Sequence, residues 1–179
     1  MPHIGEDLDS FEIDCHLINE AEQYEVILTH SYNLKILTLN IRSITKNFDN
    51  LLIAIKRMRV NLDILCLMEY WLNDNTTVPQ IPGYTSYNTT KFSNQNGGVV
   101  VNVRDLWNAV SKEPILEDAN SVIIEIPNVV TIFAVYRSPS CRRADNFLNS
   151  LDTNLALYDD RRPFILTGDI NINIGNMSD

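Results

Sequence analysis

The chain has 179 residues, of which 45% are hydrophobic, so it can bury a substantial core and is most simply one domain. Its three cysteines, Cys15, Cys66 and Cys141, are odd in number, widely spaced and form no Cys-x-x-Cys pair, so neither a disulfide framework nor a zinc site is implied. We expect an intracellular protein, nuclear or cytoplasmic and not secreted.

The formal net charge of −9 is concentrated at the N-terminus. Residues 1–33 carry eight acids and no Lys or Arg, which leaves fifteen acids and fourteen bases in residues 34–179. We therefore expect a poorly ordered or loosely packed acidic lead over 1–33, followed by a nearly neutral body over 34–179. A neutral body permits nucleic-acid binding through a local patch only. No secretory signal or membrane-spanning run is present, so no membrane partner is expected.

The first part of the body reads as a strand, a helix and a strand. Residues 34–39 form an apolar strand, apolar residues then recur at helical spacing between Phe48 and Met58, and Ile64 to Leu67 forms a second buried strand. The crossover of such a unit is right-handed and its strands are parallel. Asn40 and Glu69 are therefore expected at the same edge of one sheet.

The middle of the body is rich in strands and loops. Pro79, Pro82-Gly83 and the polar stretch from Asn88 to Asn96 indicate loops, and Gly97-Gly98 leads into a strand over 99–103. Residues 122–126 and 129–135 flank Pro127-Asn128, a pattern that predicts a tight hairpin.

A second strand–helix–strand unit follows the hairpin. Its first strand runs into Tyr136-Arg137, a helical stripe extends from Phe147 to Tyr158, and Pro163 to Leu166 forms the last buried strand. This unit is expected to bring Tyr136 and Asp169 to the carboxyl edge of a sheet, where α/β proteins bind ligands.

Polar residues at four strand ends suggest a shared site for a phosphoester. Glu69 and Asp169 are hard oxygen ligands of the sort that Mg2+ or Mn2+ prefers, and such an ion can act as a Lewis acid on a phosphate. Asn40 and Asn171 can hydrogen-bond to water or phosphate, and the Tyr136 hydroxyl can donate to a phosphoryl oxygen. Asp169 and Asn171 are two residues apart and would share one side of a continuing strand.

Each of these residues has a simpler interpretation, in which it only ends a strand or caps a helix. The three histidines, His3, His16 and His30, lie in the acidic lead, which argues against a serine or cysteine triad within the body. Gly97-Gly98 has the spacing of neither a P-loop nor a dinucleotide fingerprint. The basic pairs at 142–143 and 161–162 are usually no more than solvated helix ends.

Five blocks of sequence, taken together, resemble one family. The order and spacing from about residue 34 to residue 173 resemble the endonuclease/exonuclease/phosphatase superfamily and, within it, the apurinic-like endonuclease domain of non-LTR (LINE-type) retrotransposon reverse-transcriptase polyproteins. The Glu-Tyr-Trp-Leu and Tyr-Arg-Ser-Pro blocks favour the retrotransposon branch. The five blocks are 35–43, 69–72, 97–99, 136–139 and 168–171.

The resemblance implies a two-sheet α/β sandwich with outer helices and a role for each site residue. Glu69 with Asn40 would hold Mg2+, and Tyr136 would contact the scissile phosphate. Asp169 with Asn171 would orient or deprotonate the attacking water, and Arg137 would bind substrate. The implied reaction is nicking of one DNA strand, which leaves a 3′ hydroxyl that primes reverse transcription by a downstream reverse-transcriptase region.

Some family features are missing from the sequence. Met68 stands where a small polar residue is common, and Ile170 stands where an aromatic residue is frequent. The further aspartate and the closing Asp-His motif that the family places after additional strands do not occur before Asp179. We therefore expect a C-terminally truncated domain with an incomplete second sheet, marginal stability and impaired nicking. Two alternatives are a non-catalytic remnant that acts as a binding module and a flavodoxin-like open α/β nucleotide binder. The oligomeric state and the DNA target stay open.

Overall fold

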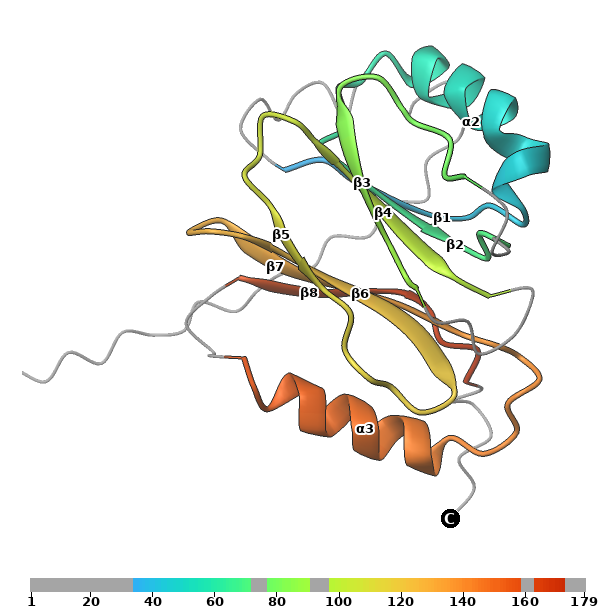
Figure 1. Ribbon diagram of the computed structural model, residues 1–179, viewed down its shortest axis with the longest axis vertical. Coiled ribbons are helices and arrows are strands. Elements are labelled where there is room, and N and C mark those ends of the chain that lie inside the picture. The colour runs from blue at the N-terminus through green and yellow to red at the C-terminus, as the bar shows by residue number, and fades with distance from the viewer. Residues whose placement is uncertain (1–33, 72–76, 91–96, 159–162, 173–179) are drawn as a thin grey trace, which may run out of the picture.

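The computed structural model describes residues 34–71, 77–90, 97–158 and 163–172. Two four-stranded sheets face each other, one helix covers the outer face of each sheet, and the result is a four-layer α/β sandwich (Figure 1). The expected acidic lead over 1–33 lies outside the described residues.

The first sheet has the strand order β1-β2-β4-β3. β1 and β2 are parallel and are joined by α2, whereas β4 pairs antiparallel with both β2 and β3. The apolar stripe of α2 packs on the outer face of this sheet, because its leucines and isoleucines recur on one side of the helix. The elements are β1 (Ile36–Asn40), α2 (Ile44–Met58), β2 (Ile64–Met68), β3 (Tyr84–Asn88) and β4 (Val99–Arg104).

The second sheet has the order β5-β6-β7-β8 and repeats the same plan. β5, β6 and β7 are antiparallel neighbours, whereas β7 and β8 are parallel and are joined by α3. The predicted hairpin at Pro127-Asn128 is confirmed, with Ile126 opposite Val130 and a positive φ of 60° at Asn128. The elements are β5 (Val110–Lys112), β6 (Ala119–Ile126), β7 (Val130–Arg137), α3 (Asp145–Leu155) and β8 (Phe164–Asp169).

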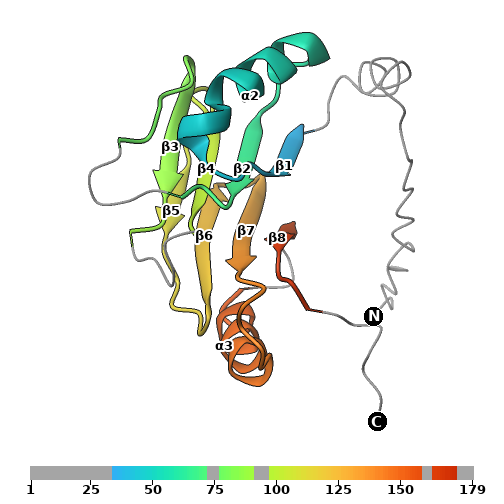
Figure 2. The same ribbon diagram turned by 90° about the vertical axis from the view of Figure 1, so that its right-hand side faces the viewer.

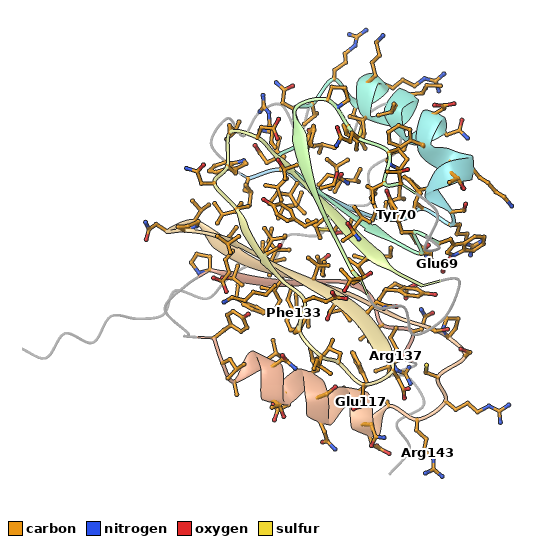
Figure 3. All side chains as sticks on the ribbon, in the orientation of Figure 1. Glu69, Tyr70, Glu117, Phe133, Arg137 and Arg143 are labelled. Carbon is orange, nitrogen blue, oxygen red and sulfur yellow. The ribbon has the colours of Figure 1, made fainter. Side chains whose placement is uncertain are left out.

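The main hydrophobic core fills the space between the two sheets. Alternate residues of β2, β4, β6 and β7 point into it, and the other set points outward under α2 or α3. Figure 3 shows Tyr70 between the first sheet and α2, and Phe133 between the second sheet and α3. A strand with a helix on one face and a sheet on the other is buried on both faces, which is why β2 and β7 read as continuous apolar runs.

The two parallel strand pairs end on the same side of the molecule. β1 and β8 are edge strands of their sheets and lie close together, and the hydroxyl oxygens of Thr38 and Thr167 are 2.7 Å apart (Figure 2). Both helices begin on the side where these strands end (Figure 1). The carboxyl ends of four strands therefore face one region.

The two-sheet sandwich and both strand–helix–strand units are confirmed. The flavodoxin-like alternative is wrong, because the strands form two facing sheets and not one open sheet. β3 and β5 were not predicted, since β3 carries the polar sequence Tyr-Thr-Ser-Tyr-Asn and β5 is three exposed residues. None of the helices in the described ranges has the length and apolar character that a membrane crossing requires.

Candidate active site

Asn40 joins the two sheets at the centre of the site. It is the last residue of β1, and its side-chain Nδ2 donates to Glu69 Oε1 at 2.7 Å and to Asp169 Oδ2 at 3.3 Å. One amide thus holds a carboxylate from each sheet. The predicted convergence of Asn40, Glu69 and Asp169 on one edge is confirmed in position, while their chemical roles stay predictions.

Glu69 is presented by a tight turn directly after β2. Its φ is 53°, and Trp71 has a φ of 56°, conformations that cost energy for residues other than glycine. The buried Tyr70 side chain anchors the turn beneath α2. Backbone bonds fix it on both sides, because Ser43 N donates to Glu69 O at 2.9 Å and Trp71 N donates to Gly97 O at 3.0 Å. Strain held in this way is a frequent property of functional sites.

Asp169 owes its place to the glycine before it. Gly168 has a φ of 139°, and a Cβ atom at this position would lie 1.8 Å from the carbonyl oxygen of Val135 on β7. Only glycine therefore lets β8 approach β7 this closely. The register then sets Asp169 opposite Tyr136, at the last pair of the two strands.

Tyr136 completes the predicted group. The residue is only 3% exposed, and the charges of Glu69 and Asp169 act on its hydroxyl. Burial, followed by the negative charges of Glu69 and Asp169, raises the pKa of Tyr136 to about 12. The hydroxyl therefore keeps its proton at neutral pH and can act as a hydrogen-bond donor.

The sequence predicts that Asn171 continues the strand of Asp169, and this prediction is wrong. β8 ends at Asp169, and Asn171 has a φ of 47° in the turn that follows. Its backbone N donates to Asp169 Oδ1 at 3.3 Å, and its side-chain Nδ2 donates to the carbonyl of Arg137 at 2.9 Å. Asn171 thus orients the Asp169 carboxylate through its backbone N–H, and its predicted contact with water stays a prediction.

Arg137 lies inside the protein and not at the substrate surface. The residue is 1% exposed, and its guanidinium donates to the carbonyls of Cys141 at 2.6 Å and Arg143 at 2.8 Å, with a longer contact of 3.4 Å to that of Asn171. It also lies over the ring of Phe147, with Cζ 5.6 Å from the ring centroid. No carboxylate among the described residues pairs with it. A buried guanidinium cannot reach a substrate directly, so the substrate-binding role is replaced by one of holding the loop after β7.

Arg42 is a rim residue that the sequence did not single out as part of the site. Its Nε lies 3.9 Å from Glu69 Oε2, and its side chain is 78% exposed. An exposed pair at this distance adds little stability. The signal available in the sequence was position alone, because Arg42 follows Asn40 by two residues.

The oxygen atoms at the centre fit a small hard cation. Asn40 Oδ1 is buried and has no hydrogen-bond partner, next to the carboxylates of Glu69 and Asp169. No cluster of three or more His, Cys, Asp or Glu occurs in the ranges that the structure describes. Mg2+ is commonly held by one or two carboxylates, with water and substrate phosphate as further ligands. Two carboxylates and one unpartnered amide oxygen match that pattern.

Comparison with known families gives one clear match. The model of the Endonuclease/Exonuclease/phosphatase family matches residues 37–176, which includes every residue of the site. None of the curated proteins matches the chain.

Solved structures show the same fold at low sequence identity. A variant of the 3′ phosphatase NExo from Neisseria, bound to a product DNA hairpin, is 18% identical with a TM-score of 0.58, and the match covers 78% of this chain and 58% of that one. A family protein from Leptotrichia buccalis is 16% identical with a TM-score of 0.57, over 80% of this chain and 69% of that one. The APE2 catalytic domain of Xenopus laevis is 17% identical with a TM-score of 0.53, over 78% and 59%. The chain thus spans less than two thirds of the length of NExo and APE2.

Proposed function

Since the chain belongs to the endonuclease/exonuclease/phosphatase family, we propose that its site hydrolyses a phosphodiester with the help of a divalent cation, and that its substrate is DNA. The observation that carries the proposal is the Asn40 amide, which joins Glu69 of one sheet to Asp169 of the other and leaves its own oxygen unpartnered.

Glu69 and the Asn40 amide oxygen would hold the cation, for which Mg2+ is the first choice and Mn2+ the second. When bound, the ion supplies Lewis acidity, which draws charge from the scissile phosphate and stabilises the departing oxygen. The negative charge of Glu69 beside Tyr136 helps to keep the proton on the Tyr136 hydroxyl, which stays available as a donor.

Asp169 is placed to act on the attacking water. Its carboxylate can accept the water proton, and the backbone N–H of Asn171 fixes one of its oxygens. The protonated Tyr136 hydroxyl can donate to a phosphate oxygen whose negative charge grows in the transition state. These two residues would therefore divide the proton transfer and the charge stabilisation between them.

The finer proposal is a nicking endonuclease of the non-LTR retrotransposon type. Support comes from the five sequence blocks and from the DNA hairpin bound by the structurally similar NExo protein. Cleavage of one strand would leave a 3′ hydroxyl that primes reverse transcription, with a reverse-transcriptase region elsewhere in the same element. Such a function places the protein in the nucleus when it acts.

A binding module without catalysis is the second candidate. The described residues include no histidine and no third carboxylate at the site, so they offer few groups that could protonate the leaving oxygen. A module of this kind would keep the fold and the affinity for DNA but would not cut it.

Nicking of supercoiled plasmid in Mg2+ tests the proposal. We expect the full chain to convert plasmid to the open circle slowly, and we expect Glu69→Gln and Asp169→Asn to slow this further by about 100-fold or more. Glu117→Gln is the matched control, because Glu117 is exposed and lies outside the site (Figure 3). Equal rates for the chain and its Glu69→Gln variant would refute the proposal, and DNA binding without any nicking would favour the binding module.

A further inference from the structure

Two loops adjoin the site, one from each half of the molecule: the first contacts Glu69 through Arg42, and the second is bound by Arg137, which also contacts Asn171. The first connects β1 to α2 over residues 41–43, and the second connects β7 to α3 over residues 138–144. Each loop follows a strand that carries a site residue at or next to its end, Asn40 on β1 and Tyr136 on β7, and each loop carries exposed arginine. Arg42 lies in the first loop, and Arg142 and Arg143 lie in the second.

The backbone of the first loop is fixed, although the side chain of its arginine is exposed. Asn47 Nδ2 donates to the carbonyls of Ile41 and Arg42, both at 2.9 Å, while the backbone N–H groups of Ile41 and Ser43 bond to the turn that presents Glu69. Arg42 and Ser43 have φ angles of 46° and 78°. The structure thus accepts backbone strain in order to hold an exposed cation beside Glu69.

The second loop is fixed from inside by Arg137. The two short bonds of this guanidinium go to the carbonyls of Cys141 and Arg143, the residues on either side of Arg142. Neither Arg142 nor Arg143 forms an ion pair with a described residue, and Figure 3 shows Arg143 extending into solvent ahead of α3. A buried arginine therefore holds the backbone from which two exposed arginines project.

Arg42, Arg142 and Arg143 differ from ordinary exposed arginines because the backbone that carries them is held in place. A cation that serves solubility alone does as well on an unconstrained loop, whereas both of these loops are fixed by buried or half-buried side chains. A further exposed basic cluster among the described residues, Lys56, Arg57 and Arg59, lies at the far end of α2. With a net charge of −1 over residues 34–179, attraction for a polyanion must come from such local placement.

We propose that Arg42 and the Arg142–Arg143 pair form a two-sided phosphate clamp, which grips the backbone of double-stranded DNA on both sides of Glu69 and Asp169. The inference rests on the proposed function, since it names the residues that place DNA over that site. Arginine suits the task because its planar fork binds phosphate oxygens in pairs. Loops on opposite sheets require a ligand with several phosphates, which excludes a single phosphomonoester.

The salt dependence of DNA binding tests the clamp. Fluorescence anisotropy of a labelled duplex is measured between 50 and 200 mM salt with the full chain carrying Glu69→Gln, which keeps both loops and is expected not to cut the probe. Each lost phosphate contact should lower the slope of log K against log salt by about 0.9. We therefore expect a loss of about 0.9 for Arg42→Ala and about 1.8 for Arg142→Ala with Arg143→Ala.

Matched controls remove the same charge elsewhere. Lys56→Ala, alone or combined with Arg57→Ala, should leave the slope unchanged. Arg42→Lys should keep the slope but weaken the affinity, because lysine retains the charge and lacks the planar guanidinium that binds two phosphate oxygens. Slopes of the clamp variants equal to those of the controls, or no duplex binding at all, would overturn the clamp. If the clamp is overturned but the unaltered chain nicks plasmid, the hydrolase proposal still holds. If the slopes fall as expected but the unaltered chain does not nick, the hydrolase proposal is refuted and the clamp proposal still holds.

Discussion

The two strand–helix–strand halves carry matching parts and hold them in different ways. Each half supplies a carboxylate, a fixed loop and an exposed arginine. In the first half the loop is held by the neutral amide of Asn47 and by backbone bonds. In the second half the loop is held by the buried charge of Arg137, and Asp169 is placed by Gly168, which no other residue can replace. Changes to the residues that hold the site of the second half should therefore destabilise the whole fold. Changes to the corresponding residues of the first half should have mainly local effects.

Gly168→Ala should show the dependence of the second half most strongly. The added Cβ would meet a backbone oxygen of β7 at 1.8 Å, so the two strands must separate. We expect a loss of about 4 kcal/mol or more in the free energy of unfolding, measured by urea denaturation. Gly83→Ala is the control, because Gly83 also has a positive φ but has no atom within 4 Å of the new Cβ, and its cost should be about 1 kcal/mol. Similar losses in both variants would argue against the close approach of β8.

Arg137→Ala should cost less but still affect the whole fold. It leaves the carbonyls of Cys141 and Arg143 without their donor and removes packing over Phe147, so we expect about 3 kcal/mol of destabilisation. Arg142→Ala, an exposed neighbour, should change stability by less than about 0.5 kcal/mol. Arg137→Lys should recover only part of the loss, since lysine cannot reach several carbonyls as a planar fork can. An unchanged midpoint for Arg137→Ala would break the contrast between the halves.

Asn47→Ala makes the corresponding change in the first half. One amide and two hydrogen bonds are lost at the half-buried start of α2, so the expected cost is about 1.5 kcal/mol. The thermal midpoint should fall only slightly, whereas DNA binding should weaken because Arg42 is no longer held. A destabilisation as large as that of Arg137→Ala would show that changes in the first half do not have mainly local effects.

The smallest expected effect is the response to alkaline pH at the contact between the halves. The folded-state pKa of Tyr136 is about 12, above the ordinary value of 10, so the folded chain holds a proton that the unfolded chain releases. The resulting stability is complete below pH 10 and is lost as the pH rises to 12. Tyr136→Phe should flatten this fall by about 1 kcal/mol or less at pH 11 in a pH series of urea denaturations. An identical pH dependence in both proteins would contradict the environment assigned to Tyr136.

The strand–helix–strand units and the meeting of Asn40, Glu69 and Asp169 could be predicted from the sequence. Apolar runs and helical spacing identify buried strands and their crossover, and handedness then brings the strand ends together. The pairing of strands into two sheets could not be predicted in this way. A strand that is buried on both faces has the same continuous apolar sequence whether its second face is covered by a helix or by another sheet. The second sheet was expected only from the family resemblance.

The buried position of Arg137 could not be read from its residue type, because arginine is almost always exposed. The sequence carried one signal, because Arg137 directly follows the largely apolar run Val130–Tyr136, and all seven residues of this run are buried in β7. Asn171 was misplaced for a different reason. The alternation rule holds only while a strand continues, and β8 ends at Asp169, two residues earlier.

The joint cation site of the two halves is tested most directly by Mn2+ binding, followed through the electron paramagnetic resonance signal of the free ion. We expect the full chain to bind one Mn2+. Glu69→Gln, which alters a proposed ligand, and Asp169→Asn, which alters the partner of the Asn40 amide, should each weaken this binding by about tenfold or more. The double variant should bind little worse than the weaker single one, because both carboxylates act on one ion. Unchanged binding in both single variants, or losses that add independently at two separate ions, would show that the halves do not share a site.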